Sequence, residues 1–240
     1  MPPLVQYVRH KTGLDPRDSS ISPPSTRHGA SQVNVDEKGF NAAVFSHLLR
    51  VARVNGDPIK TIHGDAVLPV GCFLTVAASH LDLAGEVVVV VENGDVMSHL
   101  HELRWPNSLC NALFIYRGHS KDVNELKNLL KESPPKQVLG FFDFDPAGLL
   151  MGLEDSMNFS GLVLPDIHMM SRRAGLRQLI SQSNVFFAQS EQLNRLKLKI
   201  SSDLSESLDF IVSSNVAIMQ ESMASHNVAL VVVPLRNAPN

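Results

Sequence analysis

The stretch Phe141-Phe142-Asp143-Phe144-Asp145-Pro146-Ala147-Gly148 places two acidic residues between an apolar run and a turn. Asp143 and Asp145 have one residue between them, and strand residues at that spacing point to the same side. Adjacent carboxylates repel each other unless a cation or a proton lies between them, and hard cations such as Mg²⁺ prefer oxygen ligands. The stretch therefore predicts a strand that ends in a metal site, and such a site needs another acid nearby.

Apolar runs alternate with amphipathic segments on both sides of this stretch. The expected strands are residues 86–91, 113–116, 137–142 and 161–164, and the expected helices are 121–132 and 146–153. The first of these strands is a continuous β-branched run, which is typical of a strand buried on both faces. Because strands that alternate with helices form right-handed βαβ units, we predict an α/β fold with a parallel sheet flanked by helices.

The additional acid is Glu92, which directly follows the strand at 86–91. In an open parallel sheet, functional residues lie beyond the carboxyl ends of the strands. If the two strands are neighbours, Glu92, Asp143 and Asp145 converge at one edge of the sheet. Taken singly, Glu92 fits a solvent-facing strand end, and Asp143 fits a turn or helix cap. The two motifs together favour a metal site.

These motifs together resemble a Toprim domain: a strand ending in Glu92, a second strand leading into Arg117-Gly118, and Asp143-Phe144-Asp145 with Gly148 after it. Type IA and type II topoisomerases, DnaG-type primases and several nucleases share that fold. The form Asp-x-Asp-Pro-x-Gly is similar to the branch that contains the topoisomerase VI A subunit, the meiotic double-strand-break protein and the JetD-type nuclease subunit of bacterial Wadjet plasmid-defence systems.

Two further stretches, Val91-Glu92-Asn93 and Met219-Gln220-Glu221-Ser222, resemble the JetD-like members most closely. The resemblance covers residues 85–167 well and 168–235 loosely, and it leaves out the first 80 residues. It implies Mg²⁺ (or Mn²⁺) as cofactor, with Asp143 and Asp145 as its ligands and Glu92 as a general acid–base or a further ligand. Metal ions at such sites stabilise charge on a scissile phosphate and help to generate or orient a nucleophile.

The resemblance also implies an activity and partners. The activity would be cleavage or nicking of DNA, as a subunit of a DNA-processing or plasmid- or phage-defence complex. The partners would be DNA, an SMC-like or other DNA-loading complex, and a second copy in a homodimer. Topoisomerase-type cleavage needs a tyrosine nucleophile, and the chain has two tyrosines, Tyr7 and Tyr116. Tyr7 lies in a predicted arm and Tyr116 within a predicted strand, which disfavours a covalent mechanism.

Two alternatives to a nuclease stay open. One is a non-cleaving Toprim-like module that binds a metal, a nucleotide or DNA, and the other is a topoisomerase-like strand-breaking enzyme. Weaker site candidates are the acids Asp166 and Glu221 and the DNA-contacting residues Arg117, His119, His168, Arg172 and Arg173. The structural alternatives are a helix cap for Asp166, a surface position for Glu221 and a solvated helix face for the arginines.

Composition limits the class of protein. The 240 residues carry a net charge of −3, which argues against nucleic-acid binding by bulk charge alone. No apolar run reaches membrane-spanning length, and the N-terminus does not resemble a signal peptide. Cys72 and Cys110 both lie in apolar surroundings and are expected to be buried thiols in a reducing compartment. These features predict a cytoplasmic protein that contacts no membrane.

We expect three regions along the chain. Residues 1–30 are rich in proline and serine and are predicted to be a flexible arm. Residues 31–84 are predicted to be a small N-terminal α+β region, with a helix at 39–54 and a hairpin formed by strands at 59–62 and 66–70. Residues 85–240 are predicted to be a Toprim-like domain with a C-terminal helical extension, in which helices at 172–182, 189–200 and 203–213 precede a last strand or packed segment at 228–234.

Overall fold

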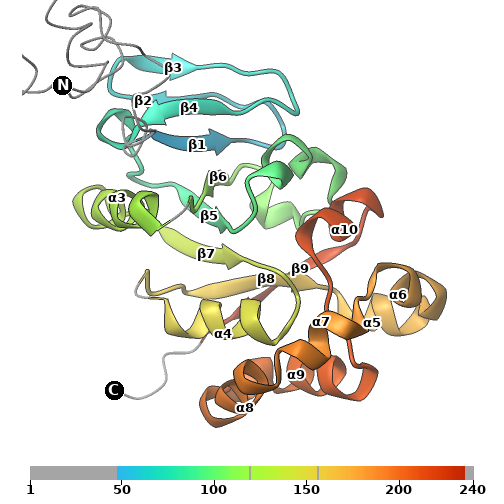
Figure 1. Ribbon diagram of the computed structural model, residues 1–240. Coiled ribbons are helices and arrows are strands. Elements are labelled where there is room, and N and C mark those ends of the chain that lie inside the picture. Colours follow the sequence, from blue (N-terminus) through green and yellow to red (C-terminus); the bar gives the residue numbers. More distant parts are fainter. Residues whose placement is uncertain (1–47, 119, 156, 236–240) are drawn as a thin grey trace, which may run out of the picture. The chain divides into compact units, whose positions relative to one another are not determined.

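A seven-stranded mixed sheet, in the order β4-β1-β6-β5-β7-β8-β9, is the centre of the fold (Figure 1). The structure is a computed structural model that describes residues 48–118, 120–155 and 157–235. The predicted arm at 1–30, Tyr7, residues 31–47 and His119 lie outside the described residues. Helices flank the sheet, so the predicted α/β class is confirmed.

The middle of the sheet is parallel, as predicted. Its strands are β5 (Val87–Val91), β6 (Leu113–Tyr116), β7 (Gln137–Phe141) and β8 (Gly161–Pro165). β5 lies between β6 and β7, so the chain runs from β5 to one side and then crosses back to the other. In such sheets, ligands bind where the strand order reverses, outside the carboxyl ends of the strands. That position is between β5 and β7.

Antiparallel strands complete the sheet on both sides. β1 (Leu48–Ala52) pairs with β6 and with β4 (Leu74–Ala77), and β9 (Leu230–Pro234) pairs with β8. The prediction of a helix at 39–54 is therefore wrong for residues 48–52. Leu49 and Val51 are buried while Arg50 between them is exposed, which is the alternation of a strand. The sheet is mixed, whereas the sequence predicted a parallel one.

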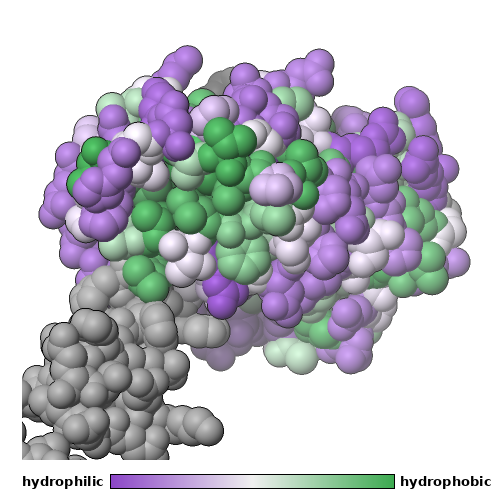
Figure 2. Space-filling model, turned by 90° about the horizontal axis from the view of Figure 1, so that it is seen from above, coloured by the Kyte–Doolittle hydropathy of each residue, from purple (hydrophilic) through white to green (hydrophobic). Residues whose placement is uncertain are grey.

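The predicted hairpin is present with a shorter second strand. β2 (Ile59–Thr61) pairs with β3 (Gly64–Ala66), and Gly64 at the turn has a φ of +115°, which favours glycine. The segment that follows leads to β4, at the edge of the sheet. Figure 2 looks down on this side of the molecule, where apolar side chains gather on the surface. The exposed apolar residues of this part of the chain are Ile62, Val67, Val70 and Phe73.

Helices α3 (Ser120–Glu132) and α4 (Pro146–Glu154) follow β6 and β7 as predicted. β5 and β6 are joined by three short 3-10 helices, η4 (Asp95–Ser98), η5 (Leu100–Glu102) and η6 (Asn107–Leu109), and η3 (Ala78–His80) follows β4. A helical block separates β8 from β9: α5 (Ile167–Arg172), α6 (Ala174–Ile180), α7 (Ser183–Ala188), α8 (Ser190–Lys199), α9 (Ser202–Ser214) and α10 (Gln220–Ser225). The single helix expected at 172–182 is therefore divided between α5 and α6.

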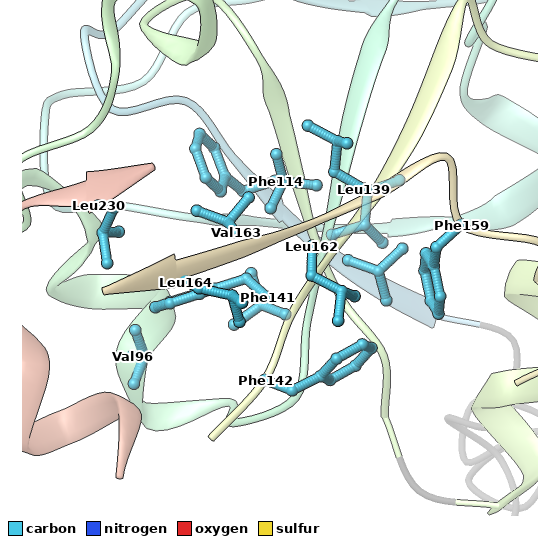
Figure 3. Packing of buried hydrophobic residues seen from close by; sticks show 14 of the residues in the cluster. Val96, Phe114, Leu139, Phe141, Phe142, Phe159, Leu162, Val163, Leu164 and Leu230 are labelled. Atoms are coloured by element: carbon cyan, nitrogen blue, oxygen red, sulfur yellow. The ribbon is translucent and has the colours of Figure 1, made fainter. Parts of the chain in front are cut away.

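The core lies on both faces of the central strands. Val88 to Val91 are fully buried, as their continuous apolar run predicted. Trp105, from the connection between β5 and β6, has its ring centroid 4.5 Å from that of Phe114 and 5.1 Å from that of Phe141. Phe142 packs edge-on against Phe159 at 5.3 Å (Figure 3). These contacts hold the carboxyl ends of β6 and β7 in place.

Two further expectations concern the surface. Cys72 is exposed and Cys110 is half-buried, and both are free thiols. The prediction of two buried thiols is therefore wrong for Cys72, because the loop before β4 lies on the sheet edge. In the part of the chain that the structure describes, every helix is too short or too polar to cross a bilayer.

Candidate functional site

Glu92 and Asp143 come together at the carboxyl edge of the sheet, between β5 and β7. Val91 is paired with Phe141 across these strands, so the residues that follow each strand emerge side by side. The Glu92 N–H donates to the Phe141 carbonyl at 3.2 Å, and the Asp143 N–H donates to Glu92 Oε2 at 3.3 Å. This is the position at which the strand order reverses, where sheets of this type bind their ligands.

Burial and like charges disfavour the charged forms of both carboxyls. Desolvation, with the charges of Glu92, Asp145 and Glu221, raises the pKa of Asp143 to about 7 against the opposing hydrogen bond from the Gln220 backbone. Desolvation likewise raises the pKa of Glu92, although the Asp143 N–H and the charge of Arg117 partly offset it. The protonated form of the Asp143 carboxyl is therefore favoured relative to an exposed aspartate, and a bound cation would compete with that proton.

Asp145 has a different structural role from Asp143. Its side chain is buried; Oδ1 accepts from the Gly148 N–H at 2.7 Å, and Oδ2 accepts from Gln189 Nε2 at 2.7 Å. Asp145 is thus the N-cap of α4, with Pro146 in the first turn. A Cβ atom at Gly148 would lie 2.1 Å from the Asp143 carbonyl oxygen, so only glycine fits there. The cap that the sequence allowed for Asp143 is formed by Asp145.

Two glutamines that the sequence did not single out as site residues hold the acidic loop. Gln220, fully buried, donates from Nε2 to the Phe141 carbonyl at 2.6 Å and accepts the Asn93 N–H at Oε1 at 2.9 Å. Its backbone N–H donates to Asp143 Oδ1 at 2.8 Å. Gln189, which holds Asp145, also accepts the Ala147 N–H at 3.0 Å. The helical block between β8 and β9 therefore fixes both aspartates.

The sequence signal for Gln220 was its place in the stretch Met219-Gln220-Glu221-Ser222, in which Glu221 was the predicted site candidate. Glu221 does lie near the pair: its Oε1 accepts from Asn93 Nδ2, and its charge raises the pKa of Glu92 and Asp143. The backbone of Phe144 adds two hydrogen bonds to Ile218, at 2.8 and 3.1 Å. The segment that leads into α10 is thus tied to the acidic loop along its length.

Arg117 is on the other side of Glu92. Its backbone N–H donates to the Val91 carbonyl at 2.8 Å, and Gly118 after it has a φ of +74°, as a tight turn requires. The Arg117 guanidinium lies 3.4 Å from Asp155 Oδ2, and Lys127 Nζ lies 3.4 Å from Oδ1 of the same residue. Asp155 therefore lies between two cations, and one of them, Arg117, also lowers the pKa of Glu92.

The remaining candidates lie on the next helix. Asp166 caps α5 by accepting from the Met169 N–H at 3.0 Å, the structural alternative that the sequence allowed. His168 is exposed and lies 3.6 Å from Glu206 on α9. Arg172 and Arg173 are exposed. The side-chain hydrogen bonds and ion pairs of Asp166 and His168 within the described residues lead to α5 and α9, away from Glu92 and Asp143.

The donor set determines which metal the site fits. Among residues 48–118, 120–155 and 157–235, no group of three or more His, Cys, Asp and Glu side chains is placed to hold a metal ion together. Mg²⁺ keeps several of its waters and binds through one or two carboxylates. Glu92 and Asp143 supply such a pair, and burial together with nearby acids raises the pKa of both carboxyls. The residues fit a hydrated Mg²⁺ held by two carboxylates, with Asp145 engaged as a cap.

Fold and site thus define an α/β protein with a mixed sheet and a cluster of carboxylates at the point where its strand order reverses. The chain belongs to the family described as a domain of unknown function (DUF7281), whose model matches residues 46–232. The match begins just before β1 and ends within β9. No protein with a curated description matches the chain.

Proposed function

We propose that this protein is a Mg²⁺-dependent nuclease that cleaves or nicks DNA at a Toprim-like site built on Glu92 and Asp143, with Asp145 as the third acid. The observation that carries the proposal is the pair of carboxyls with raised pKa values between β5 and β7. Such a pair is unfavourable in itself. The charged pair becomes favourable when a divalent cation binds. Ligand binding would therefore remove the free-energy cost of holding the two carboxylates close together.

The strand order supports the Toprim-like part of this proposal. The four parallel strands lie in the spatial order second, first, third, fourth, and the acids follow the first and the third. The motifs around Glu92, Asp143 and Gly148 resemble the JetD-like and topoisomerase VI branch. That resemblance is the ground for choosing DNA as the substrate, and a DNA-loading complex and a second copy of the chain as partners, whereas a place in the cytoplasm is proposed from the composition of the chain.

The roles of this chain's residues follow from their contacts. Asp143 and Glu92 would hold the ion, which when bound supplies charge stabilisation for the scissile phosphate. Glu92 is half-buried and burial raises its pKa, which is the direction of shift that a general acid–base needs. Gln220 orients Asp143, and Asp145 fixes the start of α4 beneath it. The loop is therefore rigid before any ligand arrives, as a preorganised site requires.

The test is nicking of supercoiled plasmid by the full chain with Mg²⁺ or Mn²⁺. Asp143→Asn and Glu92→Gln each remove one negative charge and are expected to lower the rate at least about a hundredfold. Asp166→Asn is the matched control, because Asp166 also follows a parallel strand but caps α5; it should nick at the wild-type rate. Nicking that persists in Asp143→Asn would contradict the proposal.

The occupied oxygens of Asp145 favour a second candidate, a Toprim-like module that binds metal, nucleotide or DNA without cleaving. It predicts Mn²⁺ binding by the wild type, lost in Asp143→Asn, with no nicking by either protein. A topoisomerase-like enzyme predicts a covalent DNA adduct, which Tyr116→Phe would abolish if Tyr116 is the nucleophile. The ring of Tyr116 packs against Arg50, so its contacts are those of a structural side chain.

A further inference from the structure

Arg50 lies between two aromatic rings beside the acidic loop. Its guanidinium carbon is 5.5 Å from the ring centroid of Phe73 and 5.5 Å from that of Tyr116. The arrangement is set by strand pairing, because β1 is antiparallel to β6 with Val51 opposite Ile115 and to β4 with Arg50 opposite Thr75. Arg50 therefore projects from the same sheet face as both rings, and the rings fix the plane of its guanidinium.

The charge of Arg50 is not neutralised within the described part of the chain. Some arginines there do have carboxylate partners: Arg53 Nη2 lies 2.9 Å from Glu86 Oε2, and Arg117 Nη2 lies 3.4 Å from Asp155 Oδ2. The side-chain interactions of Arg50 within residues 48–118, 120–155 and 157–235 are the two aromatic contacts. The residue is exposed, so its N–H groups can reach an anionic ligand.

The stack touches the loop that carries Glu92. A Cβ atom at Gly94 would lie 3.1 Å from Arg50 Nη1 and 3.1 Å from Tyr116 Cζ. Gly94 therefore allows the guanidinium and the ring to lie directly on the backbone two residues after Glu92. A ligand that lies on the stack would reach the carboxyl edge of β5 across Gly94.

The surroundings of the stack are apolar. Phe73 is 37% exposed, and Ile62, Val67 and Val70 on the preceding segment are 61%, 70% and 52% exposed. Apolar side chains gather on this side of the molecule (Figure 2). Proteins that bind single-stranded nucleic acid combine an aromatic face, on which a base stacks, with a cation that meets the backbone. An acidic peptide would use the cation but would gain little from an exposed phenyl ring.

We propose that Arg50, Phe73 and Tyr116 form a contact site for an unpaired nucleic-acid strand that leads across Gly94 to Glu92 and Asp143. This inference rests on the proposed function, because it assigns to the substrate of that site a single-stranded segment. Arg50 meets a phosphate, and Phe73 offers its exposed face to a base. With a net charge of −3, the chain depends on such local contacts for nucleic-acid binding.

The test measures binding without cleavage, by fluorescence anisotropy of labelled oligothymidylate with the full chain in EDTA over a series of salt concentrations. Arg50→Gln should weaken binding about tenfold and lower the slope of log affinity against log salt by about 0.7, the value for one phosphate contact on a single strand. Phe73→Ala should also weaken binding about tenfold, but with the slope unchanged, because stacking releases no counterion. A blunt-ended DNA duplex should be insensitive to Phe73→Ala.

Three variants serve as controls. Lys131→Gln removes an exposed cation at the end of α3 and should leave affinity unchanged. Arg50→Lys should restore the salt slope, and Phe73→Trp should keep the affinity of the wild type. Thermal unfolding checks each fold, and the conservative pair keeps the test decisive if Arg50→Gln or Phe73→Ala unfolds.

Three results would overturn the inference, and the first two are wild-type affinity of Arg50→Gln for oligothymidylate and equal sensitivity of the duplex and the single strand to Phe73→Ala. Loss of binding to an acidic peptide in Arg50→Gln, with oligothymidylate binding unchanged, would also overturn it. Because these measurements exclude metal, they are separate from the nicking assay. Strand binding with the expected variant effects, but without nicking, would leave this site standing while the proposed cleavage fails.

Discussion

Strand β5 has a glutamate at each of its ends, and the two have opposite surroundings. Glu86, just before the strand, is buried with Arg53, whose Nη2 lies 2.9 Å from Glu86 Oε2, and Lys60 Nζ lies 3.9 Å from the other oxygen. Glu92, just after the strand, faces Asp143, Asp145 and Glu221. The charge of Glu86 is balanced by neighbouring cations, whereas negative charge is in excess around Glu92.

The difference shows how to tell a structural acid from a functional one. Both glutamates flank the same run of valines, so burial alone does not distinguish them. The partners do: Arg53 also donates to the Pro58 carbonyl at 2.9 Å and to the Asn111 carbonyl, so the whole network is satisfied within the chain. At the carboxyl edge the raised pKa values mark carboxyls that would gain by binding a cation.

The largest change in stability is expected when Glu86 loses its ion pair with Arg53. Arg53→Met leaves Glu86 buried without its main partner, which should cost about 3–5 kcal/mol of the free energy of unfolding. Urea unfolding at neutral pH measures it. Lys60→Met is the matched control, since Lys60 is exposed and its contact is long, and it should change stability by less than about 0.5 kcal/mol. Equal losses of stability in the two variants would contradict the proposed difference between the two ends of β5.

A stabilising effect is expected from a substitution at the other end of β5, where Glu92 and Asp143 lie. The folded-state pKa of Asp143 is about 7 against an ordinary value of 3.8, so the folded protein keeps a proton that the unfolded chain releases between these values. The contribution of Asp143 to stability is therefore fully present below about pH 4, is lost as the pH rises to about 7, and stays absent above it. Asp143→Asn, whose amide oxygen can still accept from Gln220, should remove this loss and gain on the order of 3 kcal/mol at pH 8.

Thermal unfolding of wild type and Asp143→Asn over a pH series measures that gain. Lys60→Met should keep the wild-type pH dependence between about pH 4 and 7, because it leaves the Asp143 carboxyl and the Arg53–Glu86 pair in place. An Asp143→Asn protein with the same pH dependence as wild type, or one that is less stable than wild type at pH 8, would contradict the assignment of the uncompensated charge to Asp143.

A smaller loss is expected when the acidic loop loses one of its glutamines. Gln189→Ala removes the hydrogen bond to the buried Asp145 carboxylate and the acceptor of the Ala147 N–H. Hydrogen bonds to charged groups contribute about 1.5–3 kcal/mol, so urea unfolding should show a loss of about 2 kcal/mol. Gln178→Ala, at an exposed position on α6, should be neutral. A neutral Gln189→Ala would mean that Asp145 is held by the cap alone.

The smallest effect is expected from the ligand itself. Mg²⁺ that binds the folded state should raise the free energy of unfolding by about 1.4 kcal/mol at a concentration tenfold above its Kd. The gain should be lost in Asp143→Asn and Glu92→Gln, and it should persist in Lys60→Met. Calorimetric melting with and without Mg²⁺ measures it, and a gain of the same size in all four proteins would place the ion elsewhere.

The parallel centre of the sheet was predictable because its signals are local. The valine run of β5, the amphipathic pattern of α3 and the Pro146-Ala147-Gly148 turn each specify an element within a few residues. β1 was not predictable in the same way, because Leu48, Leu49 and Ala52 also fit a helical spacing. Pairing with β4 and β6 decides the strand there, and that pairing joins residues far apart in sequence.

The sequence by itself determined that Glu92 and Asp143 each follow an apolar strand, since strand ends and acidic residues can be read from short patterns, and the pairing of β5 with β7 made those strands neighbours. Only the tertiary structure decided which acids keep their charge uncompensated. Asp145 is capped and held by Gln189, 44 residues away, and Asp143 by Gln220, 77 residues away. Glu86 and Glu92 look alike along the chain, but folding brings a cation to one and more acids to the other. Such partners are chosen by three-dimensional packing, and no local pattern encodes them.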